Sequence, residues 1–263
     1  MNLTMYQIDA FTRELFHGNP AAVCPLDAWL PDDVMQAIAE ENNLAETAFY
    51  VREEGGFHIR WFTTVCEVDL CGHATLATAH ALFHHEGYIG ETLTFSSRSG
   101  VLRVRRDGDL LVLDFPVDTI RPAELPEGLM RALGGPPREL YRGKDDLLVV
   151  YDTEADIRAI EPDFAMIGKV PCRGVIVTAP GKAVDFVSRF FGPQSGIPED
   201  PVTGSAHTTL VPYWAERLKK TTFTALQLSR RGGTLRCALK GDRVEIAGHA
   251  VTYLEGTIRV PGV

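Results

Sequence analysis

Two short segments, each with a glycine that leads into an apolar stretch, hold side chains that can do chemistry. They are Glu67–Ala74, which reads EVDLCGHA, and Glu199–Ala206, which reads EDPVTGSA. A glycine-led helix start presents backbone N–H groups and a partial positive charge, and together these bind a small anion without Arg or Lys. We therefore expect Gly72 and Gly204 to supply backbone donors to a carboxylate ligand. The alternative for either glycine alone is a residue tolerated where a loop turns into a helix.

A third segment, Glu41–Phe49 (ENNLAETAF), places Glu46 between the end of an expected helix and an apolar strand. A carboxylate at the edge of a cleft is partly removed from water, which raises its pKa toward the working range of a general acid/base. The alternatives are a solvated loop carboxylate and a capping partner for Asn43, three residues earlier.

The segments that must position these residues are mostly strands. Short runs rich in β-branched and aromatic residues recur from Tyr6 to Phe115 and again from Leu147 to Val260, as expected for half-buried strands. Turn sequences such as Asp107-Gly108-Asp109 separate neighbours in both series. This pattern predicts antiparallel hairpins arranged mostly as meanders.

Each series also holds one helix without a broad polar face. His73–His85 has Ala or Leu on every side, and Ser205–Leu218 has the same character, with Pro212 expected to kink it. The glycines before the two helices lie 132 residues apart, half of the 263-residue chain. The pattern predicts two pseudo-repeated domains, each with many strands around one buried helix, joined by a proline-rich linker at 116–127.

Charge and cysteine content argue against several classes of function. The chain has 35 Asp and Glu residues against 26 Lys and Arg, a net charge of −9, which disfavours nucleic acid or an anionic membrane as a partner. Its five cysteines are scattered and form no CxxC pair, which favours a cytoplasmic location and argues against a disulfide framework or a zinc knuckle. The first residues indicate a strand rather than a signal peptide, and no apolar run reaches the ~18 residues that span a bilayer.

Two other constellations fit the sequence less well. His80 and His84 are one helical turn apart, as metal ligands can be, but His73 lies about 16 Å from His84 along the helix axis and cannot share the ion. A Ser-His-Asp hydrolase built from Ser205, His73 and Asp200 lacks the GxSxG turn. We expect neither a metal site nor a serine hydrolase.

Taken in order, five segments of the chain resemble the phenazine-biosynthesis PhzF-like family, relatives of diaminopimelate epimerase. The segments are YQIDAF (6–11), GNPAAV (18–23), NLAETAF (43–49), CGHATLA (71–77) and EDPVTGSAH (199–207). The resemblance implies an α/β (α+β) fold of two similar domains, each a mostly antiparallel, barrel-like sheet around a central helix, at 1–117 and 118–253. Residues 254–263 are expected to return to the first domain as its last strand. The resemblance also implies an active site between the domains, a homodimer and no cofactor.

The resemblance assigns roles to particular residues. It implies that Glu46 moves a proton within a small carboxylated substrate and isomerises it. His73, Asp200 and Ser205 are expected to position the substrate and to shuttle or stabilise charge. The expected substrate-binding residues beside them are Gly72, Gly204, Cys71 and Thr203.

One position departs from the epimerase relatives, which use two cysteines, one at the start of each central helix. Cys71 matches the first, but Thr203 stands at the second. A threonine hydroxyl is not appreciably ionised near neutral pH, so a two-thiol mechanism lacks one base. An amino-acid racemase or epimerase is therefore the weaker alternative, and a noncatalytic metabolite- or protein-binding member of the fold is the other. Cys71 also fits a buried small residue without a catalytic role.

Overall fold

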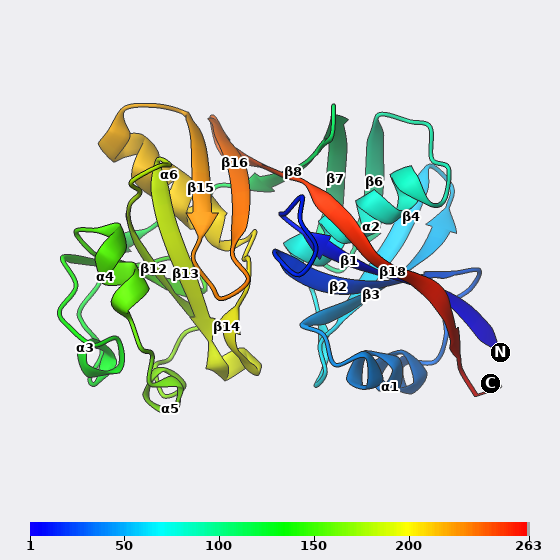
Figure 1. Ribbon diagram of the computed structural model, residues 1–263, viewed down its shortest axis with the longest axis horizontal. Coiled ribbons are helices and arrows are strands. Elements are labelled where there is room, and N and C mark those ends of the chain that lie inside the picture. Colours follow the sequence, from blue (N-terminus) through cyan, green and yellow to red (C-terminus); the bar gives the residue numbers. More distant parts are fainter. Residues whose placement is uncertain (262–263) are drawn as a thin grey trace. The chain divides into compact units, whose positions relative to one another are not determined.

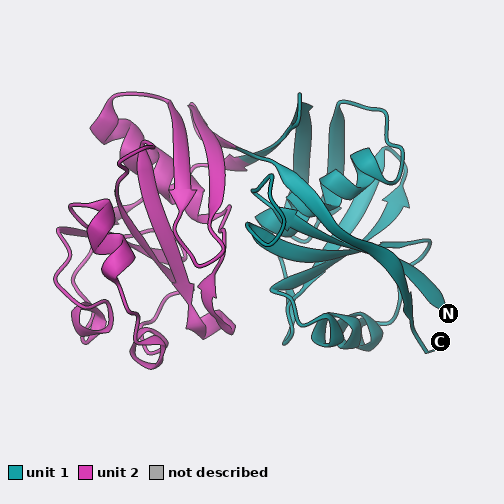
Figure 2. Ribbon diagram, viewed as in Figure 1, with its two compact units in different colours: residues 1–114, 247–263 teal, residues 115–246 magenta. Residues whose placement is uncertain are grey.

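A computed structural model describes residues 1–261 and divides the chain into two units (Figures 1 and 2). Unit 1 joins Met1–Asp114 to the chain from Ala247 onward, and unit 2 is Phe115–Ile246. The divisions fall a few residues before 117 and 253, where the sequence suggested them. In residues 1–261, no helix has the length and apolar character needed to cross a bilayer.

Unit 1 is a sheet-dominated unit with two helices among its described residues. Its strands are β1 (Asn2–Ala10), β2 (Asn19–Leu26), β3 (Glu46–Glu53), β4 (Gly56–Phe62), β5 (Glu67–Val68), β6 (Thr92–Ser97), β7 (Gly100–Asp107), β8 (Leu110–Pro116) and β18 (Ala250–Arg259), and its helices are α1 (Asp32–Asn42) and α2 (Gly72–His84). The strands pair in the order β18–β1–β2–β3–β4–β6–β7–β8, with β5 also paired to β4. The pairs β2–β3 and β4–β6 are parallel and the others antiparallel, so the expected meander is wrong at these two places.

Unit 2 repeats this topology. Its strands are β9 (Arg121–Pro122), β10 (Glu139–Arg142), β11 (Asp146–Val150), β12 (Gly174–Pro180), β13 (Phe186–Gly192), β14 (Ile197–Asp200), β15 (Thr222–Gln227), β16 (Gly233–Lys240) and β17 (Arg243–Gly248), and its helices are α3 (Leu129–Ala132), α4 (Glu154–Ala159), α5 (Phe164–Ile167), η1 (Pro193–Ser195) and α6 (Ala206–Leu218). The pairing order is β9–β10–β11–β12–β13–β15–β16, with β14 on β13, and β11–β12 and β13–β15 are parallel. The α+β class and the predominance of antiparallel pairs are confirmed.

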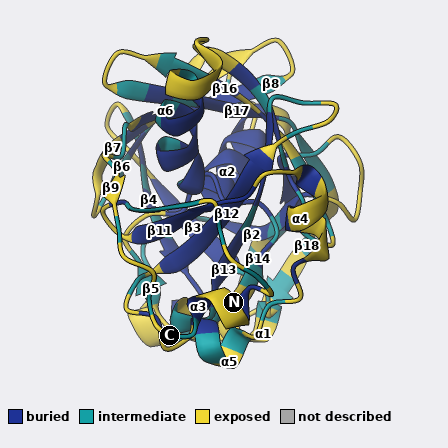
Figure 3. Ribbon diagram, turned by 90° about the vertical axis from the view of Figure 1, so that its left-hand side faces the viewer, coloured by how far each residue is buried: buried dark blue, intermediate teal, exposed yellow. Residues whose placement is uncertain are grey.

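The two central helices are largely buried, as their sequences predict, but the last turn of α6 is exposed from Glu216 to Leu218 (Figure 3). In α2 every residue from Gly72 to Phe83 is buried, because small Ala and Thr side chains let β1, β2, β3 and β18 approach it. The Thr75 and Thr78 hydroxyls donate to backbone carbonyls four residues earlier, so their polar groups are satisfied within the helix. The second helix, α6, continues through Pro212.

Each unit also contains a two-point ion pair just before its central helix. Arg60 of β4 donates from Nε and Nη2 to the two carboxylate oxygens of Glu67, at 2.7 Å each. Arg189 of β13 donates in the same two-point manner to Glu199, at 2.7 and 3.1 Å. Such paired, planar contacts fix orientation as well as distance. They tie β5 to β4 in unit 1 and β14 to β13 in unit 2.

The strands that carry these arginines are repeated in sequence. Residues 57–62 read FHIRWF and residues 186–191 read FVSRFF. In each strand the guanidinium lies over the phenylalanine two residues further on, 5.2 Å from the Phe62 centroid and 4.9 Å from that of Phe191. The duplication therefore extends from the topology to individual side-chain contacts.

Removal of Arg60 tests the contribution of this ion pair. Arg60→Met leaves the Glu67 carboxylate, with a side chain 11% exposed, without its two-point partner, and we expect a loss of about 2–3 kcal/mol of unfolding free energy. The control is Arg98→Met, since Arg98 also contacts Glu67 but is 52% exposed; it should cost less than about 1 kcal/mol. Equal losses in urea unfolding would contradict the prediction.

Buried histidines predict acid sensitivity. Burial lowers the pKa of His80, whose Nε2 lies 3.0 Å from Thr252 Oγ1, to about 3, and lowers the pKa of His207 to about 4. The unfolded chain binds protons that these folded side chains do not, so stability is complete above pH ~6.5 and falls below it, by about 1–2 kcal/mol per histidine at pH ~5. Urea unfolding at both pH values checks this. His80→Gln should reduce the pH dependence, and an unchanged slope would refute the assignment.

Candidate active site

Glu46 is the first residue of β3 and is buried. Its strand position pairs with Ala21 of the parallel strand β2. Before it, α1 ends at Asn42 and is capped by Asn43, whose left-handed backbone (φ 50°) turns the chain toward the sheet and whose N–H donates to carbonyls of α1. The structure thus places Glu46 neither in solvent nor at the cap of α1, with its side chain only 10% exposed.

His73, the second residue of α2, lies against Glu46. Its Nε2 is 3.2 Å from Glu46 Oε2, and its Nδ1 is 3.1 Å from the side-chain amide nitrogen of Asn19. Burial lowers the pKa of His73 to about 3, so the ring is neutral at pH 7. Because the Asn19 amide donates to Nδ1, the ring proton resides on Nε2, the nitrogen that lies near the carboxylate. Glu46 and His73 therefore form a close polar contact, although its angle is not that of a hydrogen bond.

Asn19 was not singled out by sequence reasoning. It opens β2 and is fully buried. One feature of the sequence could have indicated Asn19: it is the polar residue at the start of the otherwise apolar strand NPAAVCPL. A buried amide requires hydrogen-bond partners, so such a residue must contact other polar groups. Its contact with His73 spans 54 residues of sequence, so local patterns do not reveal the partner.

Cys71 completes the group in unit 1. It is the residue before α2, it is buried, and its Sγ lies 3.5 Å from His73 Nδ1. Ligand atoms of Glu46, Cys71 and His73 lie within 4.8 Å of one another. The carboxylate approaches Nε2 and the thiol approaches Nδ1. The three residues are thus close enough to hold an ion, a possibility that the sequence did not indicate.

In unit 2, Asp200 and Thr203 are joined through a side chain that the sequence did not indicate. The Thr203 hydroxyl donates to Asp200 Oδ2 at 2.5 Å. Gln227, at the end of β15, accepts from the Thr203 backbone N–H at 2.8 Å and donates to the Asp200 carbonyl at 2.8 Å. The buried Gln227 thus holds both ends of the loop that precedes α6. In the sequence, Gln227 is marked only as a polar residue at the end of a strand in which buried and exposed positions alternate.

Ser205 lies directly before α6. Its Oγ accepts a hydrogen bond from Arg173 Nη2 at 3.1 Å. Arg173 in turn pairs with the buried carboxylate of Asp146, with Nε 2.9 Å from Oδ1. Gly72 is the first residue of α2, whereas Gly204 stands two residues before α6 begins. The two helix starts are therefore similar but not identical.

The structure also shows the contacts of the residues in the two alternatives that the sequence disfavoured, the histidine metal pair and the Ser-His-Asp hydrolase. The rings of His80 and His84 lie against each other with centroids 4.3 Å apart, and His80 contacts Thr252. Asp200 bonds to Thr203, and Ser205 bonds to Arg173. No triad within one unit follows from these contacts in the part of the chain that the structure describes.

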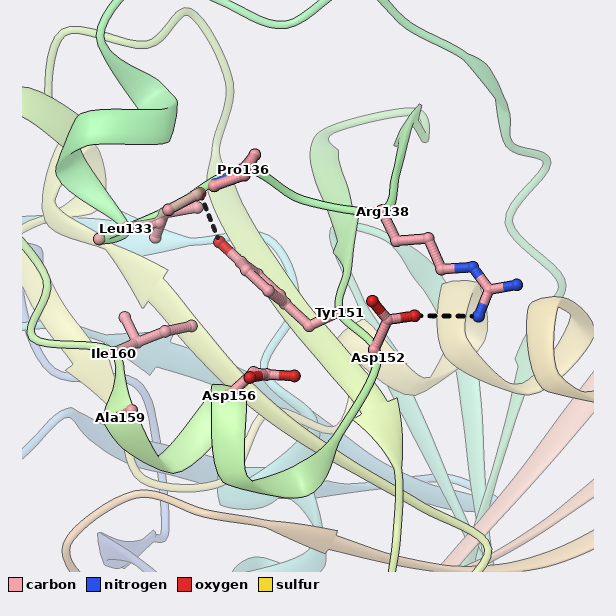
Figure 4. A pocket seen from close by; sticks show the side chains of 10 residues that line it. Leu133, Pro136, Arg138, Tyr151, Asp152, Asp156, Ala159 and Ile160 are labelled. Carbon is pink, nitrogen blue, oxygen red and sulfur yellow. Dashed lines mark hydrogen bonds and ion pairs between the residues drawn. The ribbon is translucent and has the colours of Figure 1, made fainter.

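Unit 2 also contains a cavity of about 280 Å³ (Figure 4). Within it, Arg138 Nη1 lies 3.1 Å from Asp152 Oδ1, and the Tyr151 hydroxyl lies 3.5 Å from the Gly135 carbonyl. Its lining contains none of the eight predicted site residues. The candidate residues therefore form two groups, one at the start of α2 in unit 1 and one at the start of α6 in unit 2, and neither group lines this cavity.

Comparison with known proteins covers nearly the whole chain. The family described as "Phenazine biosynthesis-like protein" matches residues 8–256. The chain is 55% identical to an uncharacterized isomerase of Pseudomonas aeruginosa over 99% of this chain and all of the relative. It is 44% identical to phenazine biosynthesis-like domain-containing protein 1 of Mus musculus, over 98% of this chain and 99% of that one.

Comparison with solved structures also finds similarity to phenazine biosynthesis proteins over nearly the whole chain. A PhzF-family phenazine biosynthesis protein of Enterococcus faecalis superposes with a TM-score of 0.96 at 48% identity, over 99% of this chain and 100% of that one. A hydroxyproline epimerase of Agrobacterium vitis superposes with a TM-score of 0.63 at 10% identity, over 98% and 92% of the two chains. At that identity the second likeness concerns the fold alone.

The tautomer of His73 gives a direct test of the site geometry. In the wild type, the Asn19 amide should keep Nδ1 unprotonated and the proton on Nε2. Asn19→Leu removes the donor while keeping a similar volume, so we expect a mixture of both tautomers. Nitrogen NMR of histidine-labelled protein reports the two ring nitrogens separately. An unchanged His73 spectrum would show that another group sets the tautomer.

Proposed function

The chain belongs to the phenazine biosynthesis-like protein family, several of whose members are named isomerases, and from this premise we propose that Glu46 is the acid/base of a cofactor-independent isomerase. The reaction is a proton transfer within a small carboxylated molecule. The observation that carries the proposal is the 3.2 Å contact between Glu46 Oε2 and the Nε2 of a neutral His73.

A carboxyl group can perform both halves of such a reaction. The carboxylate removes a proton from one atom of the substrate, and the resulting acid returns a proton to another atom, so no net proton or electron is consumed. The Nε2–H of His73 stabilises the carboxylate before the first transfer and orients it during both. Burial of the pair excludes competing water, which strengthens the electrostatic interaction between them.

The other predicted residues have supporting roles in this proposal. Gly72 supplies a backbone N–H at the start of α2. In unit 2, Ser205 and the Thr203–Asp200 pair bind or orient polar groups of the ligand, together with Gly204. These assignments draw on the sequence motifs and on the hydrogen bonds within each unit. The homodimer and the cytoplasmic location stay predictions.

One contact favours a second candidate, an amino-acid racemase. Cys71 Sγ lies 3.5 Å from His73 Nδ1, and a thiol beside an imidazole can act as a base. A racemase needs a second base on the opposite face of its substrate, but Thr203 holds that position in the repeat, and its hydroxyl donates to Asp200. The single-carboxylate mechanism therefore fits better.

Hydrogen exchange with solvent tests the role of Glu46. Wild-type protein incubated with a metabolite mixture in heavy water should incorporate deuterium into its substrate, as mass spectrometry detects. Glu46→Gln should reduce this incorporation by about 10²-fold or more, the typical contribution of a general acid/base. Ligand binding, followed by thermal shift, should persist.

Two controls make the result specific. Glu53→Gln removes an exposed carboxylate at the other end of β3 and should leave exchange intact. Cys71→Ser should retain exchange under the isomerase proposal and lose it in a racemase. Undiminished exchange by Glu46→Gln would refute the assignment, and tight ligand binding without any exchange in the wild type would favour a noncatalytic binding protein.

A further inference from the structure

Strand registers identify the residue of unit 2 that corresponds to Glu46. In unit 1, Glu46 pairs with Ala21 where the parallel strands β2 and β3 begin. In unit 2, Gly174 pairs with Asp146 where the parallel strands β11 and β12 begin. Gly174 therefore takes the place of Glu46, and Asp146 takes the place of Ala21.

The registers further along the same strands agree with this match. Three residues beyond Glu46, Phe49 pairs with Arg60. Three residues beyond Gly174, Val177 pairs with Arg189. Because Arg60 and Arg189 make equivalent ion pairs, the two strands correspond residue by residue over this stretch.

No side chain fits at position 174. A Cβ added to Gly174 would lie 2.2 Å from the ring of Phe190, well inside van der Waals contact. Unit 2 has therefore lost the carboxylate position that unit 1 uses, because an aromatic ring fills the space. Any chemistry at this place in unit 2 must come from a neighbouring residue.

Arg173, immediately before Gly174, holds a charged group in that region. Its Nε and Nη2 donate to the buried carboxylate of Asp146, its guanidinium lies 5.6 Å from the Phe190 centroid, and Nη2 also donates to Ser205 Oγ. These contacts fix the plane of the guanidinium. Within residues 1–261 the hydrogen bonds of Arg173 use Nε and Nη2 and none uses Nη1. Its side chain is 39% exposed.

We propose that Arg173 and the Ser205 hydroxyl bind the carboxylate of a small-molecule ligand, so that Arg173 determines specificity for anions. The Ser205 oxygen accepts from Nη2, which leaves its own O–H to donate to a carboxylate oxygen. Nη1 supplies the neighbouring donor, and planar guanidinium groups match carboxylates well. Asp146 holds the guanidinium in place in the absence of ligand, which lowers the entropy lost on binding.

The inference deepens the proposed function, and it rests on that function only in identifying this ligand with the isomerase substrate. Unit 1 carries the proton-transferring pair, Glu46 and His73. At the corresponding strand position, unit 2 carries Gly174 with Arg173 and Ser205. The repeat has thus diverged into a proton-transferring half and an anion-recognising half.

A pair of isosteric probes tests the inference on the full-length protein. Benzoate and benzamide have the same shape but differ in charge, and NMR titration measures the binding of each. We expect the wild type to prefer benzoate. Arg173→Met alone leaves Asp146 buried without its partner and can unfold the protein, so the main variant is Arg173→Met with Asp146→Asn. It should bind benzoate at least ~10-fold more weakly, the scale of a lost charge-assisted hydrogen bond, with benzamide unchanged.

Two further variants separate charge from geometry and from unspecific effects. Arg173→Lys keeps the charge but not the planar fork, so it should bind benzoate with intermediate affinity. Arg138→Met, which removes another arginine of unit 2 from a carboxylate pair (Figure 4), should bind as the wild type does. Circular dichroism confirms that each variant is folded.

Each outcome decides the inference. Equal binding of both probes by the wild type, or wild-type affinity for benzoate in the folded double variant, overturns it. Glu46→Gln should bind benzoate normally, since the anion site does not need that carboxylate. If benzoate binding depends on Arg173 but the wild type exchanges no metabolite hydrogen, the inference stands and the proposed function fails. If Glu46→Gln abolishes exchange while the double variant binds benzoate normally, the function stands and the inference fails.

Discussion

The two-point ion pair between an arginine of one strand and a glutamate of the next sets the position of each central helix. In unit 1, Arg60 binds Glu67 on β5, and five residues later the chain begins α2. Because the pair fixes both distance and orientation, the loop that starts α2 has a defined path. His73 consequently reaches the carboxylate at the start of β3. In unit 2, Arg189 and Glu199 constrain the chain before α6 in the same way.

The two units share a backbone arrangement but carry different side chains at equivalent positions, so their polar groups differ. In unit 1 a carboxylate at the start of β3 meets a neutral imidazole, and the buried Asn19 amide keeps the ring proton on the nitrogen near that carboxylate. In unit 2 the equivalent strand starts with Gly174, where an aromatic ring occupies the space of a side chain. The polar groups there are a guanidinium and a hydroxyl. The backbone arrangement is shared, and the chemistry depends on a few residues at the strand and helix starts.

The sequence predicted those features of the fold and the site that depend on residues near one another in the chain. The Ala-rich text of α2 predicted a helix buried on all sides, and the motifs around Glu46 and His73 predicted residues that the structure brings into contact. It did not predict hydrogen bonds between residues that are far apart in the chain. Asn19 and Gln227 are single polar residues in strands, and their contacts span 54 and 24 residues of sequence. The parallel pairs were also missed, since turn sequences report hairpins and not the crossovers that parallel strands require.

The return of β18 to pair with β1 has a consequence for synthesis of the chain. All of unit 2 lies in sequence between β8 and β18, whereas β18 pairs along nearly the full length of β1. The ribosome therefore makes every residue of unit 2 before it makes the strand that covers β1. Until then β1 has an uncovered row of backbone donors and acceptors, the kind of strand edge at which chains associate wrongly. The order of translation thus lets unit 2 close first and leaves unit 1, which holds Glu46 and His73, to be completed last.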